Sequence, residues 1–321
     1  MLAADAAVTA DPRFREDVLA GLAARPRAIP ARWFYDQAGS ELFEAITDLP
    51  EYYPTRTETA ILRRAAPEVA DRVGTGGAVV EFGSGSSTKT PILLAATRPA
   101  AYVPIDISGD FLRASSAALA GDFPAVSVLP LEADFTQPLV LPPAVAGLHK
   151  LGFFPGSTIG NLVPAAAVDL LRAMRGSLGL GASLLIGMDR VKAPEVLVPA
   201  YDDAAGVTAR FNLNLLHRIN RELAGSVPVE AFRHVARWND AAARIEMHLE
   251  ATRDVTFAVA GHPFQMAAGE TIHTENSHKY GERGGRLLLA AGGWTPVAEW
   301  RDPDGWFALI LAEAREEAAA P

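Results

Sequence analysis

Short apolar runs alternate with amphipathic stretches through the middle of the chain. The runs are AVVEFGSGSS, AYVPIDIS, VSVLPLEADF, KLGFFPGSTIGN and SLLIGMDR. Segments with helical character follow several of them, near residues 88–97, 109–120 and 164–178. Strands that helices cover on both faces are almost continuously apolar, and their alternation with helices is typical of βαβ units. The pattern predicts an α/β fold with a Rossmann-like parallel sheet.

Different patterns flank this region. Residues 8–60 show no strand pattern, and we expect helices at 13–24 and 39–48. Over 202–224 an apolar residue recurs about every fourth position, which predicts one long helix. The segments RHVARWND, RIEMHLEAT, DVTFAVAG and HPFQMAAG alternate with a period near two and predict an antiparallel sheet. TPVAEWRDPDGWFALILAEA predicts a β-hairpin that turns at residues 302–305.

These patterns predict a parallel-sheet domain interrupted by a second, α+β domain. We expect the first to comprise residues 57–190 plus 280–321, and the second residues 8–56 plus 191–279. Hydrophobic residues make up 49% of the 321 positions and charged residues 21%, as in ordinary folded proteins.

Composition excludes several classes of function. The chain has no cysteine, which rules out disulfides, thiolate nucleophiles and cysteine-bound metals. A net charge of −9 without a basic run argues against nucleic acid as a partner. No apolar stretch reaches the roughly 18 residues of a membrane span, and the N-terminus lacks a secretory pattern. We expect a cytoplasmic monomer with no membrane partner.

A glycine-rich turn follows the first apolar run. Gly83 and Gly85 would give a tight turn that a ligand can approach closely, and Asp106 ends the next run, where acids meet ribose hydroxyls. A dinucleotide is disfavoured because the third glycine is missing and Glu81 would repel a phosphate. S-adenosylmethionine carries an ammonium and a sulfonium instead, which a carboxylate favours.

The third run ends in a further acidic position. Asp134 would accept a hydrogen bond from the adenine amine of a bound nucleoside, and the ring of Phe135 would pack on the base. With the glycine turn, these residues predict S-adenosylmethionine as methyl donor well ahead of NAD.

Several longer strings resemble one family. They are IPARWFYDQAGSELFEAITDLPEYYPTRTE, VEFGSGSSTKT, YVPIDIS, GFFPGSTIGN, YDDAAGVTARFNLN and TIHTENSHKY. Together they resemble the L-histidine Nα-methyltransferases of ergothioneine biosynthesis, over roughly residues 25–310. The resemblance implies trimethylation of histidine to hercynine with S-adenosylmethionine. It also implies a methyltransferase domain, a second domain that binds the amino acid, and no metal.

The resemblance also implies roles for individual residues. Near the methyl-transfer centre it places Tyr35, Gly156 and Asn161. On the histidine substrate it places Tyr52, Asn161, Tyr201, Met247, Glu275 and Ser277. On the donor it places Gly83, Lys89, Asp106 and Asp134, to which the reading of the turn adds Glu81, Gly85 and Phe135.

The imidazole of histidine has one donor and one acceptor nitrogen. Glu275 would accept from the first and Tyr52 would donate to the second, which favours histidine over side chains without those groups. His273 and His278 flank Glu275 without a third spaced ligand, so we expect no metal. Lys192 is interpreted as a solvated charge.

Two alternatives stay open. One is an Nα-methyltransferase of a different amino acid or small amine. The other is a protein that binds the donor or the amino acid without turnover.

Overall fold

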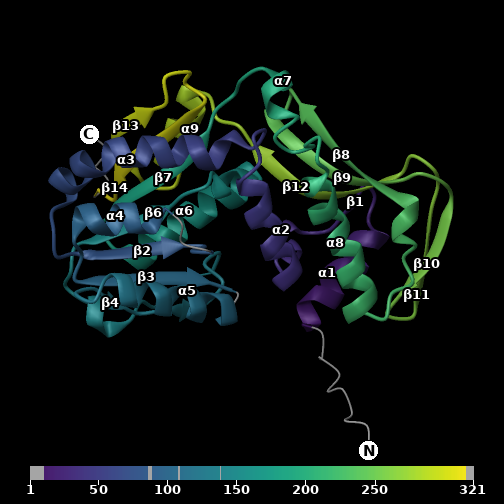
Figure 1. The fold of residues 1–321 in the computed structure, drawn as a ribbon, viewed down its shortest axis with the longest axis horizontal. Helices are drawn as coiled ribbons and strands as arrows, with labels where there is room; N and C mark the ends of the chain where they lie inside the picture. The colour runs from purple at the N-terminus through teal and green to yellow at the C-terminus, as the bar shows by residue number, and fades with distance from the viewer. Residues whose placement is uncertain (1–10, 86–88, 108, 138, 316–321) are drawn as a thin grey trace, which may run out of the picture. The chain divides into compact units, whose positions relative to one another are not determined.

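The computed structural model describes residues 11–85, 89–107, 109–137 and 139–315 (Figure 1). They form two compact units. One contains the described residues up to Tyr52 together with Ala193–Asn276, and the other contains Tyr53–Lys192 together with the described residues from Ser277 onward. The second unit holds the parallel sheet and is called the sheet unit below; the first is called the insertion unit.

A large mixed sheet forms the centre of the sheet unit. Its strands are β2 (Ala78–Phe82), β3 (Ala101–Asp106), β4 (Ser127–Val128), β5 (Leu131–Glu132), β6 (Lys150–Phe154), β7 (Ser183–Asp189), β13 (Thr295–Arg301) and β14 (Phe307–Glu313). The order is β13-β14-β7-β6-β2-β3-β4, with β5 also beside β3. Strands β2 to β7 pair in parallel, whereas β14 runs antiparallel to β7 and β13. The predicted Rossmann-like α/β sheet and C-terminal hairpin are confirmed.

Helices cover both faces of this sheet (Figure 1). Helices α3 (Tyr53–Val73), α4 (Thr90–Thr97) and α5 (Gly109–Asp122) contribute apolar side chains to the core on one face. Helices α6 (Pro164–Leu178) and α9 (Glu282–Ala291) do so on the other. Short 3-10 turns η2 (Pro143–Val145) and η3 (Thr158–Asn161) flank β6. Because the parallel strands all end at one edge, their following loops gather there.

Two features of the sheet unit differ from the expectation. The run VSVLPLEADF forms two short strands rather than one, separated at Pro130, which has no amide to donate to β3. Helix α3 was not predicted. Its buried positions include Ile61, Leu62, Ala65 and Val69, but alanines and Pro67 weaken the apolar period that would have revealed it.

The insertion unit combines helices with small sheets. Its helices are α1 (Pro12–Ala23), α2 (Gln37–Thr47), α7 (Pro194–Leu197) and α8 (Val207–Glu222), with 3-10 turns η1 (Ala31–Phe34) and η4 (Val229–Ala231). Its strands are β1 (Arg27–Ala28), β8 (Phe232–Asn239), β9 (Arg244–Ala251), β10 (Val255–Val259), β11 (His262–Met266) and β12 (Thr271–His278), whose last two residues belong to the sheet unit.

The predicted helices and antiparallel strands of the insertion unit are present, with one change. Strands β8 and β9 pair antiparallel, and so do β10 and β11, but they belong to two separate sheets. The larger sheet has the order β1-β12-β9-β8, and β1 pairs with β12 in parallel. Within the described part of the chain, no helix is both long and apolar enough to cross a bilayer.

Candidate active site

The glycine-rich turn follows β2 at the carboxyl edge of the sheet. Gly83 and Gly85 have φ values of 72° and 47°, in the left-handed region that glycine adopts without strain. The Gly85 amide donates to Oδ2 of Asp106 at 3.1 Å, so the structure brings these predicted donor-site residues together. Among the described residues other than its chain neighbours, no heavy atom lies within 4 Å of where a Cβ on Gly85 would stand. Ser86 and Ser87, the end of the expected motif, lie outside the described residues.

Glu81 lies on β2 and is only 2% exposed. Its Oε2 accepts hydrogen bonds from Thr90 Oγ1 at 2.6 Å and from the Tyr102 hydroxyl at 2.5 Å. Burial raises the pKa of Glu81 to about 7, against the opposing effect of these two donors. The carboxyl group thus ties the start of α4 and the strand β3 to β2, beneath the glycine turn.

Asp134 and Phe135 follow β5 at the same edge. Oδ1 of Asp134 accepts from the amide and hydroxyl of Thr136, at 3.0 and 2.6 Å. The Phe135 ring packs edge-on against Phe154, with centroids 5.9 Å apart. It also lies 3.3 Å from where a Cβ on Gly83 would stand, so the ring covers the glycine turn.

Lys89 and Gly156 meet at a residue that the sequence analysis did not single out. Lys89 immediately precedes α4, and Gly156 follows β6. Both donate to Oε2 of Glu58 on α3, Lys89 through its ammonium and Gly156 through its amide at 2.8 Å. The Glu58 side chain is fully buried and that of Lys89 is 12% exposed.

Asn161 ends the turn η3, which packs closely on the end of β12. A Cβ on Gly160 would stand 2.8 Å from the carbonyl oxygen of His278, an approach that only glycine permits. At the start of η3, Ser157 Oγ accepts from the amide of Asp189 at 2.9 Å. Asn161 is therefore held beside the segment that carries Ser277.

Ser277 is supported by a buried charge network. Its Oγ accepts from Lys279 Nζ at 2.8 Å, and that ammonium pairs with Asp189 at 2.7 Å. Lys192 pairs with the same carboxylate at 2.5 Å, and the Tyr53 hydroxyl donates to it at 2.6 Å. Burial raises the pKa of Asp189, but the two lysines outweigh it and lower the pKa overall. The interpretation of Lys192 as a solvated charge is wrong, because its side chain is 6% exposed.

In the insertion unit, the three predicted tyrosines belong to one aromatic cluster. The rings of Tyr52 and Tyr201 meet edge to face with centroids 6.1 Å apart. Phe43 contacts Tyr52 at 6.5 Å and Tyr35 at 5.7 Å, and Phe211 contacts Tyr35 at 5.8 Å. Each phenol is thus oriented by neighbouring rings.

The backbone of Tyr201 is also held in place. His234 Nε2 lies 2.7 Å from the Tyr201 carbonyl oxygen, and His234 Nδ1 lies 2.8 Å from the Asn212 amide nitrogen. Because that amide nitrogen can only donate, Nδ1 accepts and Nε2 carries the proton that it donates to Tyr201. Burial lowers the pKa of His234, which agrees with a neutral ring.

Met247 and Glu275 lie on neighbouring strands, β9 and β12. Met247 is buried, and its carbonyl accepts from Thr274 Oγ1 at 3.0 Å. The carbonyl of Glu275 lies 3.0 Å from Nε2 of His273. The sheet therefore brings these two predicted imidazole contacts onto adjacent strands.

Strand pairing also places Glu246 and His248 beside His273, and the possible ligand atoms of the three all lie within 4.8 Å of one another. The sequence pattern alone predicts no third ligand here. The two rings stack with centroids 4.8 Å apart and planes at 21°. Oε2 of Glu246 lies 3.2 Å from Nε2 of His248, and Oε1 of Glu246 accepts from Arg244 at 2.6 Å. The expectation of no metal therefore loses its ground in the sequence and stays a prediction.

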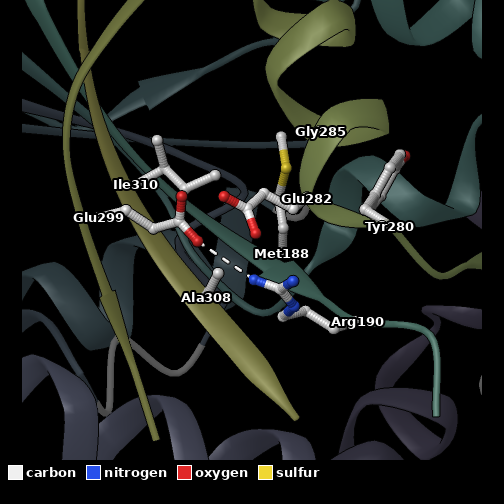
Figure 2. A pocket seen from close by; sticks show the side chains of 9 residues that line it. Met188, Arg190, Tyr280, Glu282, Gly285, Glu299, Ala308 and Ile310 are labelled. Atoms are coloured by element: carbon white, nitrogen blue, oxygen red, sulfur yellow. Dashed lines mark hydrogen bonds and ion pairs between the residues drawn. The ribbon is translucent and has the colours of Figure 1, made fainter. Parts of the chain in front are cut away.

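A small pocket lies elsewhere on the sheet unit, between β7, α9, β13 and β14 (Figure 2). Arg190 points across it to Glu299, and their closest atoms are 3.1 Å apart. None of the predicted site residues lines this pocket. Glu282, the other charged residue of its lining, pairs with Arg301, and we assign the pocket no ligand.

The sequence of the chain can now be compared with known proteins. Residues 14–314 match the family described as histidine-specific methyltransferase, SAM-dependent. The chain belongs to this family. The prediction of the family and of its dependence on S-adenosylmethionine is confirmed.

Similarity to individual members of the family supports the match. The chain is 44% identical over 317 residues to a histidine N-alpha-methyltransferase of Mycolicibacterium smegmatis, covering 97% of each chain. It is 43% identical over 304 residues to a histidine N-alpha-methyltransferase of Mycobacterium tuberculosis, covering 93% of this chain and 94% of that one. It is also 29% identical over 298 residues to ergothioneine biosynthesis protein 1 of Neurospora crassa, covering 90% of this chain and 34% of that longer protein.

The residues at the sheet edge of this family member fit the methyl donor. Gly83 and Gly85 leave the backbone accessible, and Gly85 has open space beside it among the described residues. Asp106 ends β3 and Asp134 follows the adjacent strand β5, where they can accept from ribose hydroxyls and an exocyclic amine. The acidic groups suit a cationic ligand better than a phosphate.

Three supporting residues escaped the sequence analysis. Glu58 ends the string EYYPTRTE that carries part of the family resemblance. Because helix α3 was not predicted, the sequence did not show that the Glu58 side chain points into the sheet unit. Asp189 follows a continuous apolar run, and a charge at the end of a buried strand is a usable signal. Lys279 had no comparable signal, because its contact with the distant Asp189 exists only in the folded chain.

Proposed function

We propose that this protein transfers methyl groups from S-adenosylmethionine to the α-amine of L-histidine, three times in succession, to give hercynine. The observation that carries the proposal is the match of residues 14–314 to the histidine-specific family. The names of the two relatives at 44% and 43% identity support the substrate. The name of the Neurospora relative supports a place for the product in ergothioneine biosynthesis.

The sheet unit is proposed to bind the donor and the insertion unit to bind most of the amino acid. On the donor we place Glu81, Gly83, Gly85, Lys89, Asp106, Asp134 and Phe135. The contact of Gly85 with Asp106 and the cover of Gly83 by Phe135 support this assignment. Because Glu81 is buried among Thr90 and Tyr102, its proposed role is to shape the turn beneath the donor.

On the amino acid we propose two groups of contacts. Tyr52, Met247, Glu275 and Ser277 would surround the imidazole, with Glu275 accepting from one nitrogen and Tyr52 donating to the other. Asn161 and Tyr201 would hold the carboxylate. Tyr35 and Gly156 would lie near the amine, where the Gly156 carbonyl can accept a hydrogen bond from it.

The chemistry requires alignment more than acid–base strength. When bound, the donor supplies a methyl group on a positively charged sulfur. The acceptor amine must be neutral. The reference pKa of an α-amino group is near 8 and is higher in a free amino acid, and each unit above the working pH costs about 1.4 kcal/mol. The residues of the chain hold the amine in line. After each transfer the new ammonium group loses a proton, which a tyrosine hydroxyl or water relays to solvent.

Three further expectations stay proposals. A reaction without a metal is what the family resemblance implies, and activity after dialysis against a chelator tests it. A monomeric state is tested by light scattering, and a cytoplasmic location by fractionation of the producing cells.

A panel of the standard amino acids with isotopically labelled donor tests the substrate. Mass spectrometry should show mono-, di- and trimethylated histidine and no other methylated amino acid. Methylation of another amino acid instead would keep the class of enzyme and reject histidine. Tight binding of donor and histidine without any methylated product would favour a binding protein.

A further inference from the structure

Glu58 is a buried acidic residue in the sheet unit, at a position where packing alone does not require an acid. It lies in the first part of α3, and its side chain is completely buried. One oxygen, Oε2, accepts from both Lys89 and Gly156. The other, Oε1, has no hydrogen-bond partner among the described residues. A Cβ on Gly187 of β7 would collide with it, so the strand leaves room for this carboxylate.

Such an arrangement contributes little to the free energy of unfolding. A buried ion pair seldom stabilises a protein more than well-packed apolar residues of the same size, and an unpaired carboxylate oxygen adds a further cost. The position would be filled more cheaply by an apolar side chain. A role in the chemistry of the site accounts for the charge better than a role in folding.

The two groups that Glu58 holds belong to two different loops. Lys89 lies at the end of the glycine-rich segment after β2, and Gly156 begins the loop after β6. Strands β2 and β6 are direct neighbours at the centre of the sheet. Gly156 has φ of 80°, and a Cβ built on Gly156 would stand 4.0 Å from Lys89 Nζ. Its bond to Glu58 orients the peptide plane between Pro155 and Gly156.

We propose that Glu58 is a positioning residue for methyl transfer, which uses one carboxylate oxygen to keep the donor loop and the acceptor loop in register. This inference rests on the proposed function, in which Lys89 faces the donor and Gly156 faces the amine. In-line transfer tolerates little displacement, and a misplacement of about 1 Å can lower a rate by about 100-fold. Glu58 therefore acts on the rate through the two loops without touching either substrate.

Replacement of the charge tests the inference. Glu58→Gln keeps the size of the side chain but gives up the ion pair with Lys89. We expect kcat for histidine methylation to fall by about 100-fold, while KM for histidine and Kd for S-adenosylhomocysteine change by less than about threefold. Asp71→Asn, an exposed charge loss on the same helix, is the matched control and should leave all three constants unchanged.

A second variant covers the case in which Glu58→Gln does not fold. Glu58→Asp keeps the charge but is one methylene too short to hold both groups, and should lose about 10-fold in kcat at near wild-type melting temperature. A folded variant of either kind with wild-type kcat would overturn the inference. So would losses of kcat and of donor affinity in equal proportion, since these indicate a merely structural role.

The wild-type protein separates this outcome from failure of the proposed function. If it methylates an amine other than histidine, the substrate is wrong, and the same variants are measured with that amine. If it methylates histidine and both variants retain its kcat, only the role of Glu58 is wrong.

Discussion

At the scale of single residues, Glu81 carries a carboxyl group that burial keeps largely protonated up to nearly neutral pH. Its pKa is raised to about 7 from 4.5, chiefly by burial. Between these values the folded protein holds a proton that the unfolded chain has released. The free energy of unfolding therefore falls as the pH rises through this window, by a few kcal/mol at about 1.4 kcal/mol per pKa unit.

Glu81→Gln should remove this dependence, because the amide mimics the protonated acid at every pH. Urea unfolding between about pH 4.5 and about 8 measures the effect. The difference between variant and wild type should grow in favour of the variant as the pH rises. Stability curves that stay parallel over the whole range would show that the Glu81 carboxyl titrates normally.

In the proposed function, Glu275 is the residue on which the preference for histidine depends most. Glu275→Gln weakens its proposed bond from the imidazole N–H by removing the charge of the acceptor. We expect KM for histidine to rise by about 100-fold, with Kd for S-adenosylhomocysteine unchanged. Glu44→Gln, an exposed charge loss on α2 of the same unit, serves as control. An unchanged KM would place Glu275 away from the ring.

At the scale of elements, glycines in two different conformations predict opposite effects of alanine. Gly305, in the turn between β13 and β14, has φ of 67°, whereas Gly284 lies within α9. Among the described residues beyond the adjacent backbone, no heavy atom lies within 4 Å of either Cβ position, so conformation alone decides. Gly305→Ala should destabilise the protein by about 1 kcal/mol and Gly284→Ala should stabilise it by about as much. Thermal unfolding of the two variants, compared with wild type, measures both signs.

Elements with a strong local signal were predicted well. Helix α8 has an apolar residue at every fourth position, and the hairpin has the turn residues Asp302 to Gly305, so their existence followed from local pattern. Helix α3 and the pairing of β1 with β12 were missed. The apolar period of α3 is weak because alanines occupy several of its buried positions. The pairing of β1 with β12 joins Arg27 to Ile272, which are too far apart in the sequence for a local pattern to reveal it.

At the scale of the whole molecule, the two units predict separate responses to the two ligands. S-adenosylhomocysteine alone should slow hydrogen exchange at the sheet edge, in residues 82–85 and 131–136. L-histidine alone should slow it in residues 245–251 and 271–276. Strands β10 and β11 provide an internal control that neither ligand should change.

Hydrogen exchange read by mass spectrometry measures these responses. Protection of the sheet-edge segments by histidine alone, with residues 271–276 unaffected, would contradict the proposed division of roles. It would move the amino-acid site from the insertion unit to the sheet unit.

The sequence by itself determined the α/β class, the glycine turn with its acidic neighbours, and the family, because these depend on local periodicity and on contiguous strings. The tertiary structure alone decided which side chains meet. Glu58, Lys89 and Gly156 are separated by about 30 and 100 positions, yet converge on one oxygen because parallel strands deliver their loops to one edge. It also decided that Lys192 is buried and that Glu246 lies beside His248 and His273. Burial and strand register are properties of the packed chain.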